Sequence, residues 1–279
     1  MNCKNCQDPL EENAHFCDNC GAKVIKSRIT FKLLIIELFT NVFGVDSKFF
    51  ITLKKMFTQP QEVINEYLIG VRKRYVNPFA YLAVGAAISL ITFNFFSDDF
   101  IRINSSFNKA QNEEMYKLAN ADSTAYIGLN KKELTKFKAK QKNAQIQVKF
   151  QKGMMDFMLN YFNLLAFLLL PFYALISKLT YFKPYNFGEH IVINAYLQGS
   201  TMYVSVITFL ISLVTHPLVY TFSTFLYIIY YLFAFVKLYN HSAGKTIVKL
   251  LRFIGVVLTL GIVLSLIAVL VSLIVIFLF

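Results

Sequence analysis

Long apolar runs dominate this chain and predict helices that cross a membrane. Five runs are long enough to span a bilayer and carry little or no charge; they lie at residues 78–96, about 160–177, 191–214, 218–236 and 250–278. A backbone inside hydrocarbon must satisfy its own polar groups, and a helix does so. We therefore predict an all-α, polytopic membrane protein with about five transmembrane helices, the last four forming a bundle over residues 160–279. Pro171 lies inside the second run and should kink that helix.

The segment ahead of the first run carries shorter helical patterns. Residues 31–39 are apolar but interrupted by charge and too short to span a membrane, which is typical of an amphipathic helix at a surface. Gln61 to Leu68 predicts a further short helix, and Pro60 costs little in its first turn. We expect residues 23–77 to form a cytoplasmic amphipathic helical region.

Residues 97–159 differ from the rest because Asn, Ser, Lys and Gln dominate them. The stretch from Lys131 to Lys152 favours a helix and carries eight lysines and one glutamate. Such a charge run is usually a solvated surface. We expect an extracytoplasmic, polar and partly helical loop here.

Composition supports a membrane protein and bounds its partners. The chain has 279 residues, of which 56% are hydrophobic, and a mean hydropathy of +0.50. Its formal charge of +12 is typical of loops that face anionic lipid, and only rarely of nucleic-acid binding. Arg72, Lys73 and Arg74 stand just before the first apolar run, so we expect them to anchor the chain to membrane lipids. Recognition of one specific anionic lipid is the alternative.

The four cysteines of the chain all lie in its first twenty residues, as Cys3-x2-Cys6 and Cys17-x2-Cys20. Two such pairs can place four thiolates around one tetrahedral Zn²⁺, with no position left for water or substrate. We therefore predict a zinc ribbon at 1–22 that holds one structural zinc ion. Gly21 suits the tight turn after the second pair, whereas Gln7 occupies the same place after the first pair.

The charges of the short loops predict which way the chain crosses the membrane. The loops at 178–190 and 237–249 carry lysines, whereas the loop at 215–217 carries no Lys or Arg. Short loops rich in Lys and Arg stay in the cytoplasm, which puts the N-terminus and its ribbon inside and residues 97–159 outside. Free thiols as metal ligands also suit the reducing cytosol. No cleavable signal peptide is visible ahead of the first cysteine pair.

A polar stripe along the third run is the most suggestive pattern inside the membrane. Six residues recur at helical spacing on one face: Asn194, Gln198, Thr201, Ser205, Thr208 and Ser212. Such a stripe either packs against another helix or lines a polar pathway. Glu189 and His190 stand at its start, so the candidate polar pocket comprises Glu189, His190, Asn194, Gln198, Thr201 and Ser205. The alternative for Glu189 and His190 is that they cap the helix.

Signatures of catalysis and of ion coupling are missing from the sequence. The middle of each predicted span lacks Asp, Glu and Lys, and the chain has no phosphate-binding loop, HExxH or GxSxG motif. No intramembrane Ser/His arrangement or carboxylate pair is apparent. We therefore expect no enzyme. The ribbon has one basic residue, Lys4, against four acidic ones, which excludes nucleic acid as its expected partner.

Three stretches resemble a family of uncharacterised bacterial membrane proteins, domain of unknown function 3667. They are CKNC…FCDNCG at 3–21, TLKKMFTQPQEVINEYLIGVRKRYVNPFAYL at 52–82 and GEHIVINAY at 188–196. The first cysteine pair lacks the glycine that often follows it in such heads. The resemblance implies a zinc-ribbon head, a cytoplasmic helical region, several transmembrane helices and a place in the bacterial inner membrane. It implies no activity.

Together these patterns predict a non-enzymatic membrane scaffold or adaptor. In this interpretation the ribbon and the helices that follow it dock a cytosolic protein or the chain's own membrane face. The alternative is a channel or transporter-like protein that uses the polar face of the third span.

Overall fold

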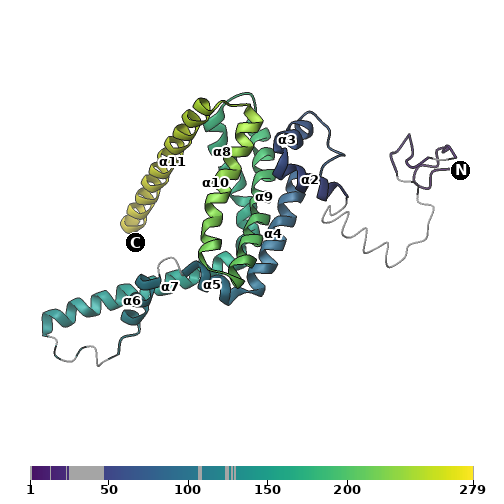
Figure 1. The fold of residues 1–279 in the computed structure, drawn as a ribbon. Helices are drawn as coiled ribbons and strands as arrows, with labels where there is room; N and C mark the ends of the chain where they lie inside the picture. Colours follow the sequence, from purple (N-terminus) through teal and green to yellow (C-terminus); the bar gives the residue numbers. More distant parts are fainter. Residues whose placement is uncertain are drawn as a thin grey trace. The chain divides into compact units, whose positions relative to one another are not determined.

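Helices form almost all of the regular structure that the computed structural model describes, which covers residues 2–12, 14–22, 24, 47–105, 109–122, 126, 128 and 130–278. The chain divides into two compact units, Met1–Val42 and Phe43–Phe279. The helices of the second unit are α2 (Ser47–Thr58), α3 (Pro60–Leu68), α4 (Pro78–Phe95), α5 (Ser97–Ser105), α6 (Lys109–Ala119), α7 (Lys131–Leu168), α8 (Leu170–Tyr181), α9 (Phe187–Val214), α10 (Leu218–Tyr239) and α11 (Ala243–Leu278), and Figure 1 shows their arrangement. Outside these helices, an isolated β-bridge joins Asn2 to Pro9.

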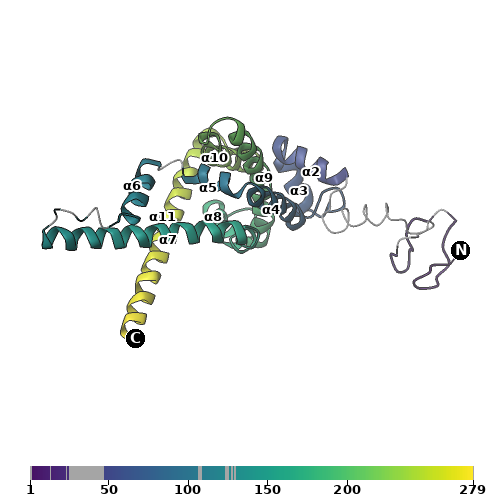
Figure 2. The same ribbon diagram turned by 90° about the horizontal axis from the view of Figure 1, so that it is seen from below.

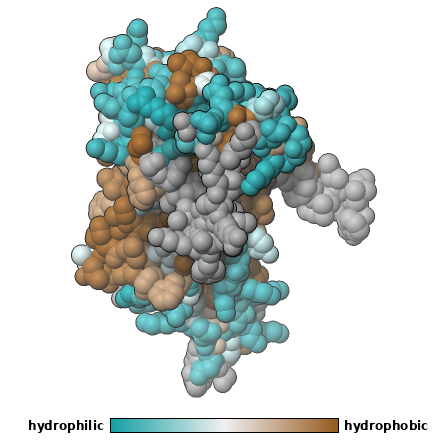
Figure 3. Space-filling model, turned by 90° about the vertical axis from the view of Figure 1, so that its right-hand side faces the viewer, coloured by the Kyte–Doolittle hydropathy of each residue, from teal (hydrophilic) through white to brown (hydrophobic). Residues whose placement is uncertain are grey.

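Five helical segments are long and apolar enough to cross a membrane, which confirms the predicted number. They are Pro78–Phe95, Leu164–Tyr181, Phe187–Val214, Leu218–Tyr239 and Ala243–Ile267. Figure 3 shows an apolar band between two hydrophilic zones on the face that it draws. The fifth segment begins seven residues before the predicted start at 250, so its first turns carry Lys245 and Lys249.

The second span is interrupted where the sequence predicts a kink. α7 ends at Leu168 and α8 begins at Leu170, with Pro171 in the first turn of α8. Proline lacks the N–H that would continue the helical ladder, and its ring clashes with the preceding turn. The spanning segment therefore consists of the end of α7 followed by α8, and Pro171 disturbs it as predicted.

α9 is the central helix of the membrane bundle, and α4 approaches it closely. A Cβ added at Gly199 would lie 2.7 Å from Cδ1 of Tyr81, and one added at Gly85 would lie 3.1 Å from the Gly199 carbonyl oxygen. Small residues let two helix backbones come this near. The Tyr81 ring occupies the space that a side chain at position 199 would need.

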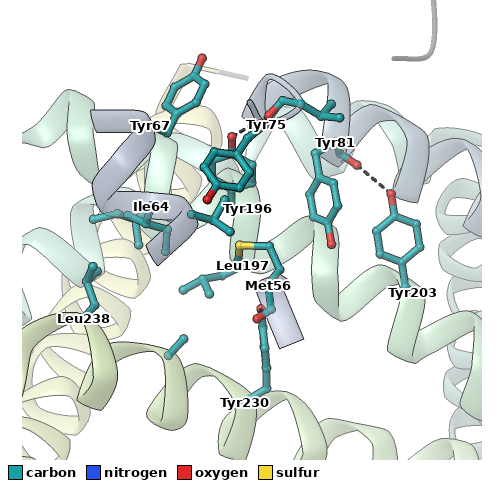
Figure 4. Packing of buried hydrophobic residues seen from close by; sticks show 14 of the residues in the cluster. Met56, Ile64, Tyr67, Tyr75, Tyr81, Tyr196, Leu197, Tyr203, Tyr230 and Leu238 are labelled. Carbon is teal, nitrogen blue, oxygen red and sulfur yellow. Dashed lines mark hydrogen bonds between the residues drawn. The ribbon is translucent and has the colours of Figure 1, made fainter. Parts of the chain in front are cut away.

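α2 and α3 pack against α9 and α10 and share one core with them. Pro60 starts α3 as predicted, and it also leaves the Met56 carbonyl without its helical N–H donor. The Tyr230 hydroxyl of α10 donates to that carbonyl at 3.0 Å. Figure 4 shows Met56 and Tyr230 in this core. The amphipathic helix predicted at 31–39 lies outside the described residues.

Residues 97–159 are more helical and more closely packed than a solvated loop. In α5, Phe100 and Ile103 are buried against Phe93 of α4 and Phe209 of α9. These two α5 residues are three positions apart and share one helix face, while Asp98 is exposed. α6 and α7 lie side by side and extend away from the bundle (Figures 1 and 2). α5 is therefore packed against α4 and α9, within the residues where the sequence predicts a polar, partly helical loop.

Candidate metal centre and buried polar network

Four cysteine sulfurs meet at one point in the N-terminal unit. The Sγ atoms of Cys3, Cys6, Cys17 and Cys20 all lie within 4.8 Å of one another. The Cys3–Cys20 and Cys6–Cys17 sulfur pairs are each 3.6 Å apart. A disulfide needs about 2.05 Å, whereas sulfurs at about 2.3 Å from a tetrahedral ion lie about 3.8 Å from one another. The thiols are free, and they can hold one metal ion together.

The two Cys-x2-Cys turns share one backbone arrangement. The Gln7 N–H donates to the Cys3 carbonyl at 2.9 Å, and the Gly21 N–H donates to the Cys17 carbonyl at 2.8 Å. The backbone angle φ is 63° at Gln7 and 69° at Gly21. This left-handed conformation costs a residue with a Cβ about 1–2 kcal/mol and costs glycine much less. The second turn thus has the residue that suits it, and the first does not.

The thiols of the head differ in acidity. The Ala22 backbone N–H and the Asn5 side chain lower the pKa of the Cys20 thiol to about 6. A backbone hydrogen bond from Asp8 lowers the pKa of Cys6, but the neighbouring cysteines and desolvation together raise it to about 12. Hydrogen bonds therefore favour the thiolate at Cys20, whereas the neighbouring sulfurs disfavour it at Cys6. A divalent cation at the centre removes that obstacle, because coordinating thiols are deprotonated.

The predicted stripe on α9 faces the interior of the bundle. Asn194, Ser205, Thr208 and Ser212 are buried, and Gln198 and Thr201 are partly buried.

Three of the four hydroxyl groups of the stripe, those of Thr201, Thr208 and Ser212, find partners on their own helix, whereas Ser205 Oγ lies 3.5 Å from the Tyr220 hydroxyl of α10. Thr201 Oγ1 donates to the Gln198 carbonyl at 2.8 Å, and Ser212 Oγ donates to the Phe209 carbonyl at 2.6 Å. By contrast, the side-chain Oε1 of Gln198 is buried and accepts no hydrogen bond. Most of the stripe therefore resembles helix packing, and Gln198 is the exception.

His190 lies at the centre of a largely buried polar network between α8, α9 and α10. Its Nδ1 is 2.8 Å from Ser177 Oγ, and its Nε2 is 3.3 Å from the Tyr239 hydroxyl. Asn194 Nδ2 donates to Ser177 Oγ at 2.8 Å and to the His190 carbonyl at 2.7 Å. Ser177 Oγ in turn donates to the Ala174 carbonyl at 3.1 Å.

One assignment of protons satisfies this whole network. Ser177 Oγ accepts from Asn194 and from Nδ1–H of His190 and donates its single proton to Ala174, while Nε2 of His190 accepts from Tyr239. The sequence analysis did not reveal this contact between Ser177 and His190, which lies near the ends of two candidate spans. The two residues stand on different helices, and no spacing in the sequence reports contacts between helices.

Glu189 and His190 are adjacent in sequence but have different environments. Glu189 forms a capping box: its Oε2 accepts from the Asn186 N–H at 2.6 Å, and its own N–H donates to Asn186 Oδ1 at 2.9 Å. The helix-cap alternative is confirmed for Glu189. The positive end of the helix dipole also stabilises the negative charge of its carboxylate. His190, by contrast, is wholly buried.

The predicted basic cluster is exposed at the turn between α3 and α4. Arg74 forms an ion pair with Glu66 at 3.0 Å, and the Arg72 guanidinium lies 5.6 Å from the centre of the Tyr67 ring. Lys73 is exposed beside them. Lipid anchoring by these three residues stays a prediction.

Tyrosine hydroxyls from α9 and from the connection between α8 and α9 form hydrogen bonds to the segment around this turn. Tyr196 of α9 donates to the Val76 carbonyl at 2.6 Å, and Tyr185 donates to Asn65 Oδ1 at 2.7 Å. Farther along, Tyr203 donates to the Tyr81 carbonyl at 3.0 Å (Figure 4). The sequence analysis missed these residues. Their one signal was the abundance of tyrosine in predicted spans, and that pattern is equally typical of interfacial anchoring.

Comparison with known proteins finds one match, and it covers the segment to which these tyrosines form hydrogen bonds. No curated protein and no solved structure matches the chain. A family model described as "Protein of unknown function (DUF3667)" matches residues 46–90, which cover α2, α3, the basic turn and most of α4. The matched segment is therefore the one that the tyrosines bind. Over these residues the chain resembles that family, and the structure adds to the match five helical segments able to span a membrane.

Proposed function

We propose that the chain is a non-enzymatic scaffold or adaptor of a bacterial inner membrane, and that its zinc-filled head docks a cytosolic protein. The observation that carries this proposal is the closed set of four protein sulfurs around one point. Four sulfur ligands favour Zn²⁺ among biological metals and leave no open position for a substrate, so such sites hold structure together.

The surface of the head supports a protein as the partner. Phe16 is 57% exposed and adjoins the ligand Cys17. Exposed aromatic side chains often anchor protein interfaces. The exposed acidic side chains include Glu11 and Asp18, and a filled site adds a charge of about −2. This surface repels phosphate and therefore argues against nucleic acid.

The second compact unit, Phe43–Phe279, which we call the membrane unit, supports a role without catalysis. Ser177 and His190 are the pair nearest to a catalytic arrangement that the described residues offer, and both are buried. Every hydrogen-bonding position of the Ser177 hydroxyl is used. A nucleophile must reach its substrate, so this pair is better suited to joining α8 to α9.

The same proposal includes the orientation of the chain in the membrane. Lys178 and Lys183 lie at the end of the second span and just after it, and Lys245 and Lys249 stand in the first turns of the fifth. A cytoplasmic place for them puts the head in the cytosol as well. Reporter fusions after residue 24 and between α6 and α7 should fall on opposite sides of the membrane. Two reporters on the same side would contradict the proposed orientation.

The docking proposal is tested by comparing two head variants in native membranes. Cys17→Ser/Cys20→Ser removes the metal, whereas Phe16→Ala keeps all four ligands and changes only the exposed surface. After crosslinking, a cytosolic protein recovered with wild type should be lost from both variants, although Phe16→Ala still binds zinc. A partner retained by both variants would show that the head does not take part in binding it.

A channel or transporter is the second candidate, and the unpaired Gln198 oxygen is the observation that favours it. A polar atom without a protein partner can face water or a solute. In a background without the native cysteines, Gln198→Cys and Ser205→Cys should then react with membrane-impermeant thiol reagents. Unreactive thiols at both positions would mean that the polar stripe on α9 serves only in packing against other helices.

A further inference from the structure

One face of α7 exposes large apolar side chains well beyond the membrane-spanning segment. Seven of them are between 47% and 68% exposed: Ile146, Phe150, Met154, Phe157, Tyr161, Leu164 and Leu168. Their spacings of three and four residues place all seven on one side of the helix, which we call the α7 apolar face.

The opposite side of α7 makes the protein contacts. Ala144, Leu159 and Ala166 are buried there. Gln145 Nε2 donates to the Ala119 carbonyl of α6 at 3.0 Å, and the Leu159 carbonyl accepts from Asn94 of α4 at 3.0 Å. One side of the helix therefore packs on protein, and the other side exposes a row of apolar side chains.

The α7 apolar face continues the lipid-facing side of the second span. Leu164 and Leu168 belong to the candidate span that begins at Leu164, so in a bilayer their exposed side chains would lie against hydrocarbon. The same face then runs from Tyr161 back to Ile146 without a change of side. Continuity therefore suggests that the membrane also covers this outer part.

The direction of α7 makes such a contact feasible. α7 extends sideways from the bundle of α4, α9 and α10 instead of along their axes (Figures 1 and 2). A helix with this direction can follow the plane of the membrane surface. Exposed lysines, among them Lys142 and Lys149, border the apolar face on one side, where they can reach headgroup phosphates.

We propose that the α7 apolar face from Ile146 to Tyr161 lies in the interface of an anionic lipid bilayer, with its lysines on the headgroups. Helices that lie in an interface combine an apolar side with lysines at its border, and both the buried area and the attraction to anionic lipid stabilise them. This assigns the second half of the polar loop to the membrane surface and does not depend on the function proposed for the head.

The chain has no tryptophan, so a single introduced Trp reports its own surroundings. Phe150→Trp and Met154→Trp place the probe on the α7 apolar face. Lys152→Trp is the matched control, because position 152 is exposed on the other side of the same turn. The full-length variants are reconstituted into vesicles of phosphatidylcholine and phosphatidylglycerol, with and without bromine on the acyl chains, after their helix content has been checked against wild type.

The proposal predicts that brominated lipid quenches the Phe150→Trp and Met154→Trp variants severalfold more strongly than Lys152→Trp, and that the difference grows with the share of phosphatidylglycerol. Equal weak quenching of all three variants, with free access to aqueous iodide, would overturn it in favour of a solvated arm. Probes on the apolar face that are shielded from both lipid bromine and iodide would also overturn it, because a second copy of the chain would then cover the face.

Discussion

The four-cysteine head and the membrane unit are held together by different means. Among the described residues of the head, Cys3 and Cys17 alone are buried, and both are candidate metal ligands. The membrane unit instead buries large side chains such as Tyr81, Tyr196 and Phe209. A segment of this size cannot build a sufficient core and needs a metal or disulfides, whereas a helix bundle is stabilised by packing. The two units should therefore lose their structure independently.

Removing the metal should have the largest effect and should be confined to the head. Metal binding to structural zinc sites contributes about 10–16 kcal/mol, which exceeds any other source of stability in so short a segment. A strong chelator should make the head sensitive to protease while the helix content measured by circular dichroism stays unchanged. Cys17→Ser/Cys20→Ser should behave the same without chelator. Loss of helix content on chelation would show that the membrane unit also depends on the ion.

Gly199→Ala should be the most damaging single change inside the membrane unit. The new Cβ would lie 2.7 Å from the buried Tyr81 ring, and overpacking of this kind costs about 1–3 kcal/mol. Thermal unfolding in detergent measures the loss. Gly255→Ala on α11 is the matched control, because no heavy atom lies within 4 Å of its added Cβ. Equal stability of the two variants would contradict the close approach of α4 and α9.

Tyr196→Phe should destabilise the membrane unit somewhat less. It removes the donor to the buried Val76 carbonyl, and an unsatisfied buried group of this kind costs about 1–2 kcal/mol. Tyr161→Phe is the control, because Tyr161 is exposed and should lose almost nothing. Both variants can be followed by denaturant unfolding with helix content as the signal. Identical denaturation midpoints for the two variants would show that the hydrogen bond from Tyr196 does not stabilise residues 46–90.

Gln7→Gly should stabilise the head, and its effect should be the smallest of the changes described. Gln7 adopts φ 63°, as Gly21 adopts φ 69°, and glycine relieves about 1 kcal/mol of backbone strain there. The gain should appear as severalfold tighter metal binding in competition with a chelator dye. Gly21→Ala should weaken binding by a similar factor. Weaker binding by Gln7→Gly would mean that the two turns are not equivalent.

Patterns local in sequence predicted much of this molecule. Run length predicted the five spans, Pro171 the interruption between α7 and α8, and two cysteine pairs the sulfur cluster. Each depends on neighbouring residues or on a fixed spacing, which a sequence displays directly.

Contacts between distant helices could not be predicted in this way. The hydrogen bond from Tyr196 to Val76 joins residues 120 positions apart, and Ser177 meets His190 across two helices. Periodicity reports which side of a helix is polar and does not report its partner. The stripe on α9 therefore kept two interpretations until the partners of its hydroxyl groups were known.

The central claim is that four cysteines hold a structural zinc ion in the head of a membrane protein. The most direct test combines metal analysis of the purified full-length protein with X-ray absorption at the zinc edge. The account predicts one zinc ion per chain with four sulfur neighbours at about 2.3 Å and no oxygen neighbour. A protein without zinc, or a zinc ion that keeps a water ligand, would contradict it.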